Sequence, residues 1–273
     1  MSLLFRAIAS GSSGNCYLVH SGTTTLLVDV GISGKRIAEG LAGAGLTPDD
    51  VDAILITHEH SDHIKSLGIM QRKSPRALVY SNAGTFECIV DLLEEGRHVL
   101  FTTGESFTVG DITVHPFPVS HDAAEPVGYT FTLAGDEPNK VAIVTDTGCI
   151  TEEIYEAVRD ADILALEANH DESVLMMCRY PYHVKRRILS DRGHLCNEAA
   201  AAFMCRILTE QEKRPVFLLA HLSQQNNTPE MALITVRNIL EEMQVFKERP
   251  DSIEELVLEV ALRDRPSRVF RLG

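Results

Sequence analysis

The sequence contains no apolar run long enough to cross a membrane. Its longer runs, such as Val216–Ala220, are far short of the ~20 residues that a span requires. The first ten residues include Arg6 and no longer apolar region follows them, which argues against a signal peptide. The six cysteines form no Cys-x-x-Cys pair, so we expect reduced, buried cysteines rather than disulfides or a zinc–thiolate site. These absences predict a cytoplasmic protein that does not bind membranes.

Basic residues are also scarce. The 273 residues include 25 Lys and Arg against 39 Asp and Glu, a formal charge of −14. This balance argues against a nucleic-acid-binding surface that is basic all over, but it leaves room for a local basic groove. The composition is otherwise that of a globular chain, with 44% hydrophobic residues, and the length is sufficient for a sizeable core. Since no Ser-, Gly- or Pro-rich linker divides the chain, we expect one domain over residues 1–273.

The order of the expected elements indicates a layered fold. Strands are expected at Leu3–Ala9, Cys16–His20, Thr24–Val30, Val51–Thr57, Ala77–Ser81, Phe107–Val109, Ile112–Phe117, Val127–Leu133, Val141–Thr145, Ile163–Glu167, Val216–Ala220, Leu256–Ala261 and Val269–Leu272. Helices are expected at Ser33–Ala44 (ended by Gly45), Ala83–Glu95, Thr151–Arg159, over much of Glu172–Leu208, and at Pro229–Met243. Two strand-rich stretches, each followed by helices, predict an α/β (α+β) sandwich with helices outside two sheets.

The most informative segment is His58-Glu59-His60-Ser61-Asp62-His63, which directly follows an apolar strand. Imidazole nitrogens and carboxylate oxygens are the ligands that zinc prefers. On an extended segment His58 and His60 point the same way, so both can bind one metal. If a helix begins near Ser61, Asp62 and His63 can face a second metal beside the first. The alternative is a histidine-rich surface turn.

Three further candidate ligands follow other apolar strands. His121 comes after Ile112–Phe117, Asp146 after Val141–Thr145, and His221 after Val216–Ala220. Each residue taken singly is compatible with an ordinary loop. Because strand ends are rigid supports for a metal site, the recurrence of the pattern favours the ligand interpretation.

The motif His58-x-His60-x-Asp62-His63 resembles the HxHxDH signature of the metallo-β-lactamase fold, and Asp29, His121, Asp146 and His221 follow the order of that fold's other motifs. The resemblance covers nearly the whole chain and implies a four-layer αββα sandwich with a centre for two divalent metal ions, zinc or else manganese or iron. It implies that one metal is bound by His58, His60 and His121, the other by Asp62, His63 and His221, and that Asp146 bridges both. It also implies that Asp29 holds the ligand loop through hydrogen bonds.

A narrower resemblance is to the YycJ/WalJ-type bacterial metallo-hydrolases, a branch associated with 5′-to-3′ DNA exonuclease activity. The similar phrases are Ser10-Gly11-Ser12-Ser13-Gly14-Asn15, Asp29-Val30-Gly31, Leu164-Ala165-Leu166-Glu167-Ala168-Asn169-His170-Asp171, Gly193-His194-Leu195-Cys196-Asn197 and His221-Leu222-Ser223. Cys196 departs from the serine expected in its phrase, which weakens any role for a hydroxyl there. The branch implies a DNA substrate.

Other residues are candidates for handling such a substrate. Asp62 could orient the attacking hydroxide as well as bind metal, and His194 could donate a proton to the leaving group, or else cap or pack a helix. The basic run Lys185, Arg186 and Arg187 could attract phosphate, or form a solvated helix face. The loop that contains Ser12 and Asn15 could line the site, or simply connect two strands.

Two other functions remain open at the level of the sequence. The same metal pair could serve a small-molecule hydrolase, such as a cyclic phosphodiesterase, thioesterase or lactonase, and the acidic composition suits that class equally. A non-catalytic protein that kept the fold would have lost ligands, whereas every expected ligand is present. The apolar surfaces of Pro229–Gly273 could pack in the core or form a homodimer.

Overall fold

The alternation of apolar residues in β1 (Leu3–Ala9) shows how the strands build the layers. Leu3 and Phe5 belong to one apolar cluster, whereas Leu4 and Ile8 belong to another on the opposite face of the strand. Strands with two buried faces read as nearly continuous apolar runs, which explains why the sequence shows runs rather than strict alternation. The computed structural model describes residues 2–133, 139–245 and 255–273.

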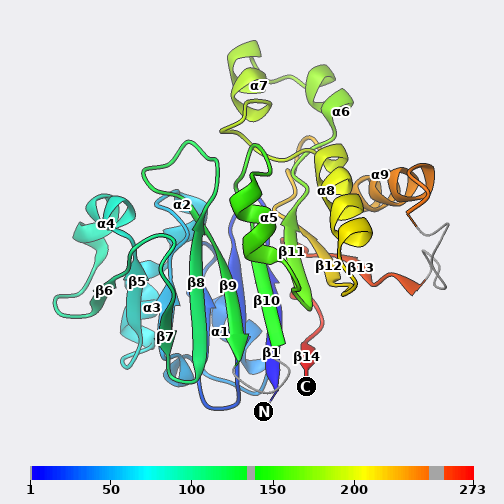
Figure 1. Ribbon diagram of the computed structural model, residues 1–273. Coiled ribbons are helices and arrows are strands. Elements are labelled where there is room, and N and C mark those ends of the chain that lie inside the picture. Colours follow the sequence, from blue (N-terminus) through cyan, green and yellow to red (C-terminus); the bar gives the residue numbers. More distant parts are fainter. Residues whose placement is uncertain (1, 134–138, 246–254) are drawn as a thin grey trace.

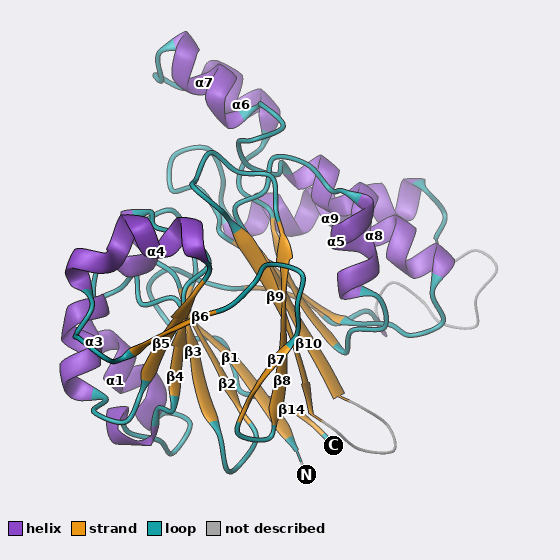
Figure 2. Cartoon of the chain, turned by 60° about the vertical axis from the view of Figure 1, so that its left-hand side comes forward, coloured by secondary structure: helices purple, strands orange, loops and turns teal. Residues whose placement is uncertain are grey.

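Among these residues, two seven-stranded mixed sheets pack face to face (Figures 1 and 2). The first has the order β14-β1-β2-β3-β4-β5-β6, with β2 (Cys16–His20), β3 (Thr25–Val28), β4 (Ala53–Leu55), β5 (Leu78–Ser81), β6 (His98–Leu100) and β14 (Phe270–Leu272). The second has the order β13-β12-β11-β10-β9-β8-β7, with β7 (Phe107–Val109), β8 (Ile112–Pro118), β9 (Val127–Leu133), β10 (Asn139–Val144), β11 (Ile163–Glu167), β12 (Val216–Ala220) and β13 (Leu258–Val260). Strands β3 to β6 are parallel, as are β10 to β13.

Helices cover the outer face of each sheet (Figure 2). The first sheet is covered by α1 (Gly34–Ala42), α3 (Leu67–Lys73) and α4 (Ala83–Ile89), which contribute to one apolar cluster. The second sheet is covered by α5 (Glu152–Val158), α8 (Asn197–Glu210) and α9 (Pro229–Glu242). A third cluster, with side chains from both sheets, fills the space between them. The arrangement is the expected αββα sandwich.

The apolar face of α9 packs in the core rather than remaining free. Ala232, Val236 and Leu240 are buried in the cluster that also contains α8. This accounts for much of the apolar character of the C-terminal segment without a second copy of the chain. Residues 246–254 of that segment, and residues 134–138 between β9 and β10, lie outside the described residues. Among the helices of the described residues, none combines the length and apolar character needed to span a membrane.

Some element boundaries differ from the sequence-based expectations. The helix expected at Ala83–Glu95 ends at Ile89 and tightens into a 3₁₀ turn at Val90–Leu92, after which Leu93 is extended and packs against the core. Helix α1 ends at Ala42, and Gly45 completes the following turn at φ +82°, where glycine carries no steric cost. The short elements α3 and β6 were not expected.

Two short helices stand away from the sandwich. They are α6 (Glu172–Met177) and α7 (Tyr182–Ile188), which Figures 1 and 2 show above the ends of the strands. We call residues 171–192 the arm. Next to its base, α8 begins at Asn197 and is capped by Cys196, whose Sγ accepts a hydrogen bond from the Ala199 amide at 3.3 Å. The thiol therefore serves as a helix cap at this position.

Candidate metal centre and adjoining cavity

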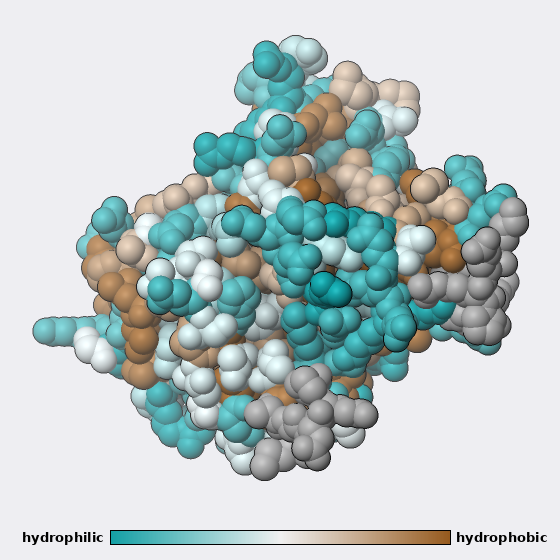
Figure 3. All heavy atoms as spheres, viewed as in Figure 1, coloured by the Kyte–Doolittle hydropathy of each residue, from teal (hydrophilic) through white to brown (hydrophobic). Residues whose placement is uncertain are grey.

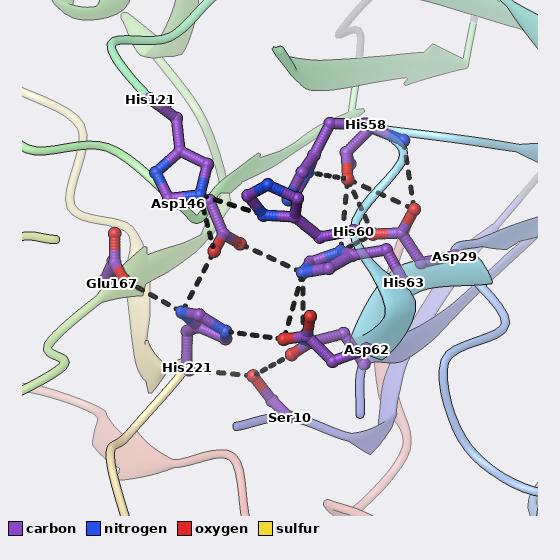
Figure 4. A network of polar contacts seen from close by, with 12 residues as sticks. Ser10, Asp29, His58, His60, Asp62, His63, His121, Asp146, Glu167 and His221 are labelled. Atoms are coloured by element: carbon purple, nitrogen blue, oxygen red, sulfur yellow. Dashed lines mark hydrogen bonds and ion pairs between the residues drawn. The ribbon is translucent and has the colours of Figure 1, made fainter. Parts of the chain in front are cut away.

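Both sheets deliver polar residues to the same edge of the sandwich. His58 and His60 follow β4, and the short helix α2 (Ser61–Ile64) then presents Asp62 and His63. From the second sheet, His121 follows β8, Asp146 follows β10 and His221 follows β12. Figure 4 shows these side chains converging from separate elements. The structure therefore brings together all seven ligands that the resemblance implies.

Six of the seven side chains form two neighbouring groups of three. His58, His60 and His121 each offer a ligand atom within 4.8 Å of the others, and Asp62, His63 and His221 do the same. Asp146 lies between the groups, with its Oδ2 at 3.3 Å from Nε2 of His63 and its Oδ1 at 3.8 Å from Nε2 of His121. This is the arrangement that two metals sharing one bridging carboxylate would require.

Four of the five histidines have their Nδ1 atoms engaged outside the group of ligand atoms. The partners are Thr57 Oγ1 for His58 at 3.0 Å, Asp29 Oδ2 for His63 at 2.7 Å, the Gly193 carbonyl for His121 at 3.0 Å and Glu167 Oε1 for His221 at 2.9 Å. Such bonds fix the tautomer and leave Nε2 as the atom that could bind a metal. Nε2 of His58 is buried and has no hydrogen-bond partner among the described residues. A bound cation would satisfy it, so the residues fit a metal centre.

Asp29 holds the loop of residues 57–63 in place through hydrogen bonds. Its Oδ1 accepts a hydrogen bond from the Thr57 amide at 2.9 Å, and its Oδ2 accepts bonds from the Thr57 hydroxyl and from Nδ1 of His63. The side chain is fully buried. Close packing of this loop needs a glycine two residues later, because a Cβ on Gly31 would lie 1.5 Å from the carbonyl oxygen of Asp62.

Three residues at the site have left-handed backbone conformations. Asp29, Asp146 and His221 have φ values of +59°, +58° and +54°, and each follows a strand. This conformation costs a non-glycine residue about 1–3 kcal/mol and persists where surrounding contacts impose it. At His221 one such contact is the bond from its amide to the Ser10 hydroxyl, at 2.8 Å. This backbone conformation directs the side chains of the three residues toward the site.

The two ligand groups differ in their electrostatics. Burial would lower the pKa of His63, but the charges of Asp29 and Asp146 raise it well above its ordinary value. Burial is likewise outweighed at His221, where Asp146 and hydrogen bonds to Asp62 and Glu167 raise the pKa to about 10. In contrast, burial lowers the pKa of His58, and His63 and His121 lower it further. The carboxylates thus create a negative potential that favours cations on the side of Asp62 and His221.

Glu167 belongs to the site, although the sequence analysis gave it no role. It ends β11 and is fully buried. Its Oε1 accepts bonds from Nδ1 of His194 at 2.8 Å and Nδ1 of His221 at 2.9 Å, while Oε2 accepts the Thr147 amide at 2.7 Å. Burial would raise the pKa of Glu167, but the charge and hydrogen bonds of the two histidines hold it below its ordinary range. Its place at a strand end, like that of Asp146, is the signal that could have identified it.

His194 lies beside the ligands but is more exposed than most of them. Its ring centroid is 5.0 Å from that of His121 and 5.3 Å from that of His221, and Glu167 holds its Nδ1. It also lines a cavity of about 320 Å³ next to the ligands, together with Ser12, Asn169, Tyr180, Arg187 and Arg263. His194 is therefore the histidine through which the ligand cluster and the cavity meet.

The candidate substrate contacts occupy different positions. Ser12 and Arg187 line the cavity, and Arg187 pairs with Asp122 at its edge. Lys185 and Arg186 lie on α7 outside the cavity lining, and the Lys185 amine donates to the Met176 carbonyl at 2.6 Å. Asn15 is fully buried, which the sequence did not indicate. Its Oδ1 accepts the Gly11 amide at 3.0 Å and its Nδ2 lies 3.2 Å from Nε2 of His63, so it adjoins the ligands from the interior.

Comparison with known proteins agrees with this geometry. Residues 24–216 match the model of the beta-lactamase superfamily domain. The chain is 43% identical over 245 residues to exodeoxyribonuclease YycJ of Bacillus anthracis, covering 89% of this chain and 90% of that protein. It is 40% identical over 241 residues to exodeoxyribonuclease WalJ of Streptococcus pneumoniae, covering 86% and 87%. The crystal structure of the metallo-beta-lactamase fold protein YhfI from Bacillus subtilis superposes with a TM-score of 0.72 at 17% identity, covering 99% of both chains.

The similarity to YhfI, at 17% identity, concerns the fold. The family model and the two exodeoxyribonucleases concern the family. The matched family model covers most of the chain, and the two curated relatives are matched over nearly their whole lengths. The chain therefore belongs to the beta-lactamase superfamily, in the family that contains the exodeoxyribonucleases YycJ and WalJ.

Proposed function

We propose that this protein is a metal-dependent phosphodiesterase that degrades DNA from the 5′ end. The observation that carries the proposal is the junction of two ligand groups at Asp146, directly beside a polar cavity that His194 and two arginines line. The identity to two proteins named exodeoxyribonucleases supports DNA as the polymer. The reduced cysteines and the composition support the cytoplasm as its location.

The chemistry of the ligand atoms indicates which metals the centre would hold. We assign His58, His60 and His121 to one ion, Asp62, His63 and His221 to the other, and Asp146 to both. Nitrogen and carboxylate ligands suit zinc and are also compatible with manganese or iron. When bound, two such ions supply an activated water at neutral pH and neutralise charge on the attacked phosphate.

The protein's own side chains would complete the reaction. Asp62 is partly exposed, and its Oδ2 lies 3.5 Å from Nε2 of both His63 and His221. Burial would raise its pKa, but these hydrogen bonds lower it below the ordinary range, so the carboxylate stays ionised. We assign Asp62 the role of orienting the attacking water.

His194 would serve the leaving group. Because Glu167 accepts the proton on Nδ1, Nε2 is the nitrogen available for transferring a proton to the departing oxygen. A positioned acid of this kind contributes roughly 10²–10⁴-fold to a rate. Ser12 and Arg187 would contact the phosphate in the cavity, and Lys185 and Arg186 the backbone beyond it.

The choice of substrate is tested by offering several phosphodiesters and esters to one preparation. Protein stripped of metal would be reloaded with Zn²⁺ or Mn²⁺ and incubated with DNA, RNA, a cyclic nucleotide, a thioester and a lactone. Preferential cleavage of DNA, absent in His60→Ala, is expected. Turnover of a small substrate without cleavage of DNA, by protein with both metals bound, would assign the site to a small-molecule hydrolase instead.

A further inference from the structure

The arm rises from the residues that frame the metal centre. At its base the Asn169 amide donates to the Leu195 carbonyl at 2.8 Å, and the Asn197 amide donates to the His170 carbonyl at 2.9 Å. The two stems therefore pair beside His194. On the returning stem, the Arg192 guanidinium donates to the His121 carbonyl at 3.0 Å. These bonds connect the arm to the loops that carry His121 and His194.

The tip of the arm exposes large apolar side chains. Met177 is 80% exposed, Tyr182 69% and Met176 50%, and the bond from Lys185 to the Met176 carbonyl holds the two helices side by side. Single exposed apolar residues are ordinary, but a cluster on a projecting element marks an interaction surface. Figure 3 shows hydrophobic and hydrophilic residues next to each other on this projection.

The charge of the tip identifies the kind of partner. Residues 176–188 include the four cations Arg179, Lys185, Arg186 and Arg187 and no acidic residue, although the whole chain has a net charge of −14. Of these four, Arg187 pairs with Asp122 at the edge of the cavity. Cations interleaved with exposed Tyr and Met suit a nucleic acid, in which phosphates alternate with flat bases. A basic, aromatic tip beside a phosphodiester-cleaving centre matches the chemistry of a polynucleotide.

The size of the cavity adds a constraint. At about 320 Å³ it has the volume of a pocket for one small ligand, and Tyr180, Val184 and Ile188 of the arm form part of its wall. A space of this volume suits the end of one strand better than a duplex. The arm stands at its edge, where the end of a duplex would have to open.

Building on the nuclease activity proposed above, we propose that the arm is a strand-separating wedge for duplex DNA. Tyr182 and Met177 stack on the terminal base pair and replace the stacking lost on opening, while Arg179 and Arg186 hold the backbone phosphates. Apolar side chains that insert between base steps unstack them in other DNA-bound proteins, and aromatic stacking tolerates any base sequence. The wedge then feeds one strand past Arg187 toward His194.

The test replaces both tip residues in one variant, Met177→Ser/Tyr182→Ser. Its matched control is Ile234→Ser/Met243→Ser, which removes side chains of similar exposure, 59% and 64%, on and next to α9. Each protein would be assayed on a blunt duplex, on the same duplex with mismatched terminal pairs, on the single strand, and on bis(p-nitrophenyl) phosphate. The oligomeric state of each would be measured by sedimentation.

The tip variant is expected to cleave the blunt duplex about tenfold more slowly than the parent. Mismatched ends should restore most of the rate, and hydrolysis of the small diester should be unchanged. An unchanged ratio of duplex to single-strand rates would overturn the wedge while leaving the nuclease function intact. Equal loss on all four substrates, or a change of oligomeric state, would also overturn it. A parent that cleaves no DNA would instead refute the proposed function.

Discussion

Replacing Glu167 with glutamine is expected to weaken metal binding and turnover together. One buried oxygen of this carboxylate accepts hydrogen bonds from both His194 and His221, and the other accepts the Thr147 amide. Glutamine has nearly the same shape but only one acceptor oxygen. Whichever way the amide turns, its NH₂ group faces a hydrogen-bond donor, and the negative charge beside His194 and His221 is lost.

The magnitude follows from these contacts. A hydrogen bond to a buried charged group contributes about 1.5–3 kcal/mol. Loss of the partner that orients a ligating histidine typically reduces metal affinity about 10–100-fold, which we expect at the site of His221. A further loss of about 10–100-fold in the rate at saturating metal is expected through His194, as part of the contribution of a general acid.

The assay separates the two effects. Metal affinity would be measured by titration with a competing chelator, and the cleavage rate under single-turnover conditions at saturating metal. His194→Ala should lower only the rate, and the exposed Glu153→Gln should change neither quantity. Because Glu167 acts on the rate through His194, combining Glu167→Gln with His194→Ala should add little further loss. If Glu167→Gln retained both full affinity and full rate, the role assigned to this carboxylate would be wrong.

Three further perturbations follow from the same contacts. His60→Ala should lose the metal that it shares with His58 and His121 and abolish hydrolysis, while circular dichroism shows a retained fold; activity at normal metal content would contradict the ligand assignment. Asp29→Asn should destabilise the metal-free protein by about 3 kcal/mol, because it weakens the buried acceptor of His63 and Thr57; an unchanged urea midpoint would refute this. His170 is buried, and burial lowers its pKa to about 4. The unfolded chain therefore takes up a proton at His170 near pH 6.5 and the folded chain does not, so the contribution of His170 to the free energy of unfolding is intact above pH 6.5 and falls by about 3 kcal/mol as the pH decreases to 4. His170→Gln should flatten this part of the unfolding profile, and a profile identical to that of the parent would exclude the explanation.

The residues of the candidate metal centre could be predicted from the sequence because each is tied to a local signal. His58, His60, Asp62 and His63 lie within six residues, and Asp146 and His221 each follow an apolar strand. The parallel order of β10, β11 and β12 places their ends at one edge of the sheet, and this converts a recurring sequence pattern into a spatial cluster.

The strand-end position of Glu167 could have marked it as a site residue, but its hydrogen-bond partners could not be predicted from the local sequence. It lies 27 residues from His194 and 54 from His221, and the three meet only in the folded chain. The burial of Asn15 has the same origin, since the loop before β2 folds under α2 and places the side chain against His63. The early end of α4 was also unpredictable from the local sequence. Leu93 is extended and packs against the apolar cluster between the first sheet and its covering helices.

The most direct test of the account is a time course of cleavage with duplex DNA labelled at either the 5′ or the 3′ end. Metal-loaded protein should release mononucleotides stepwise from the 5′ end, so the 5′ label appears at once in the smallest product while the 3′-labelled strand shortens gradually. His60→Ala should leave both labels in full-length DNA. Degradation from the 3′ end, internal cleavage, or intact DNA in the presence of protein with both metals bound would contradict the central claim.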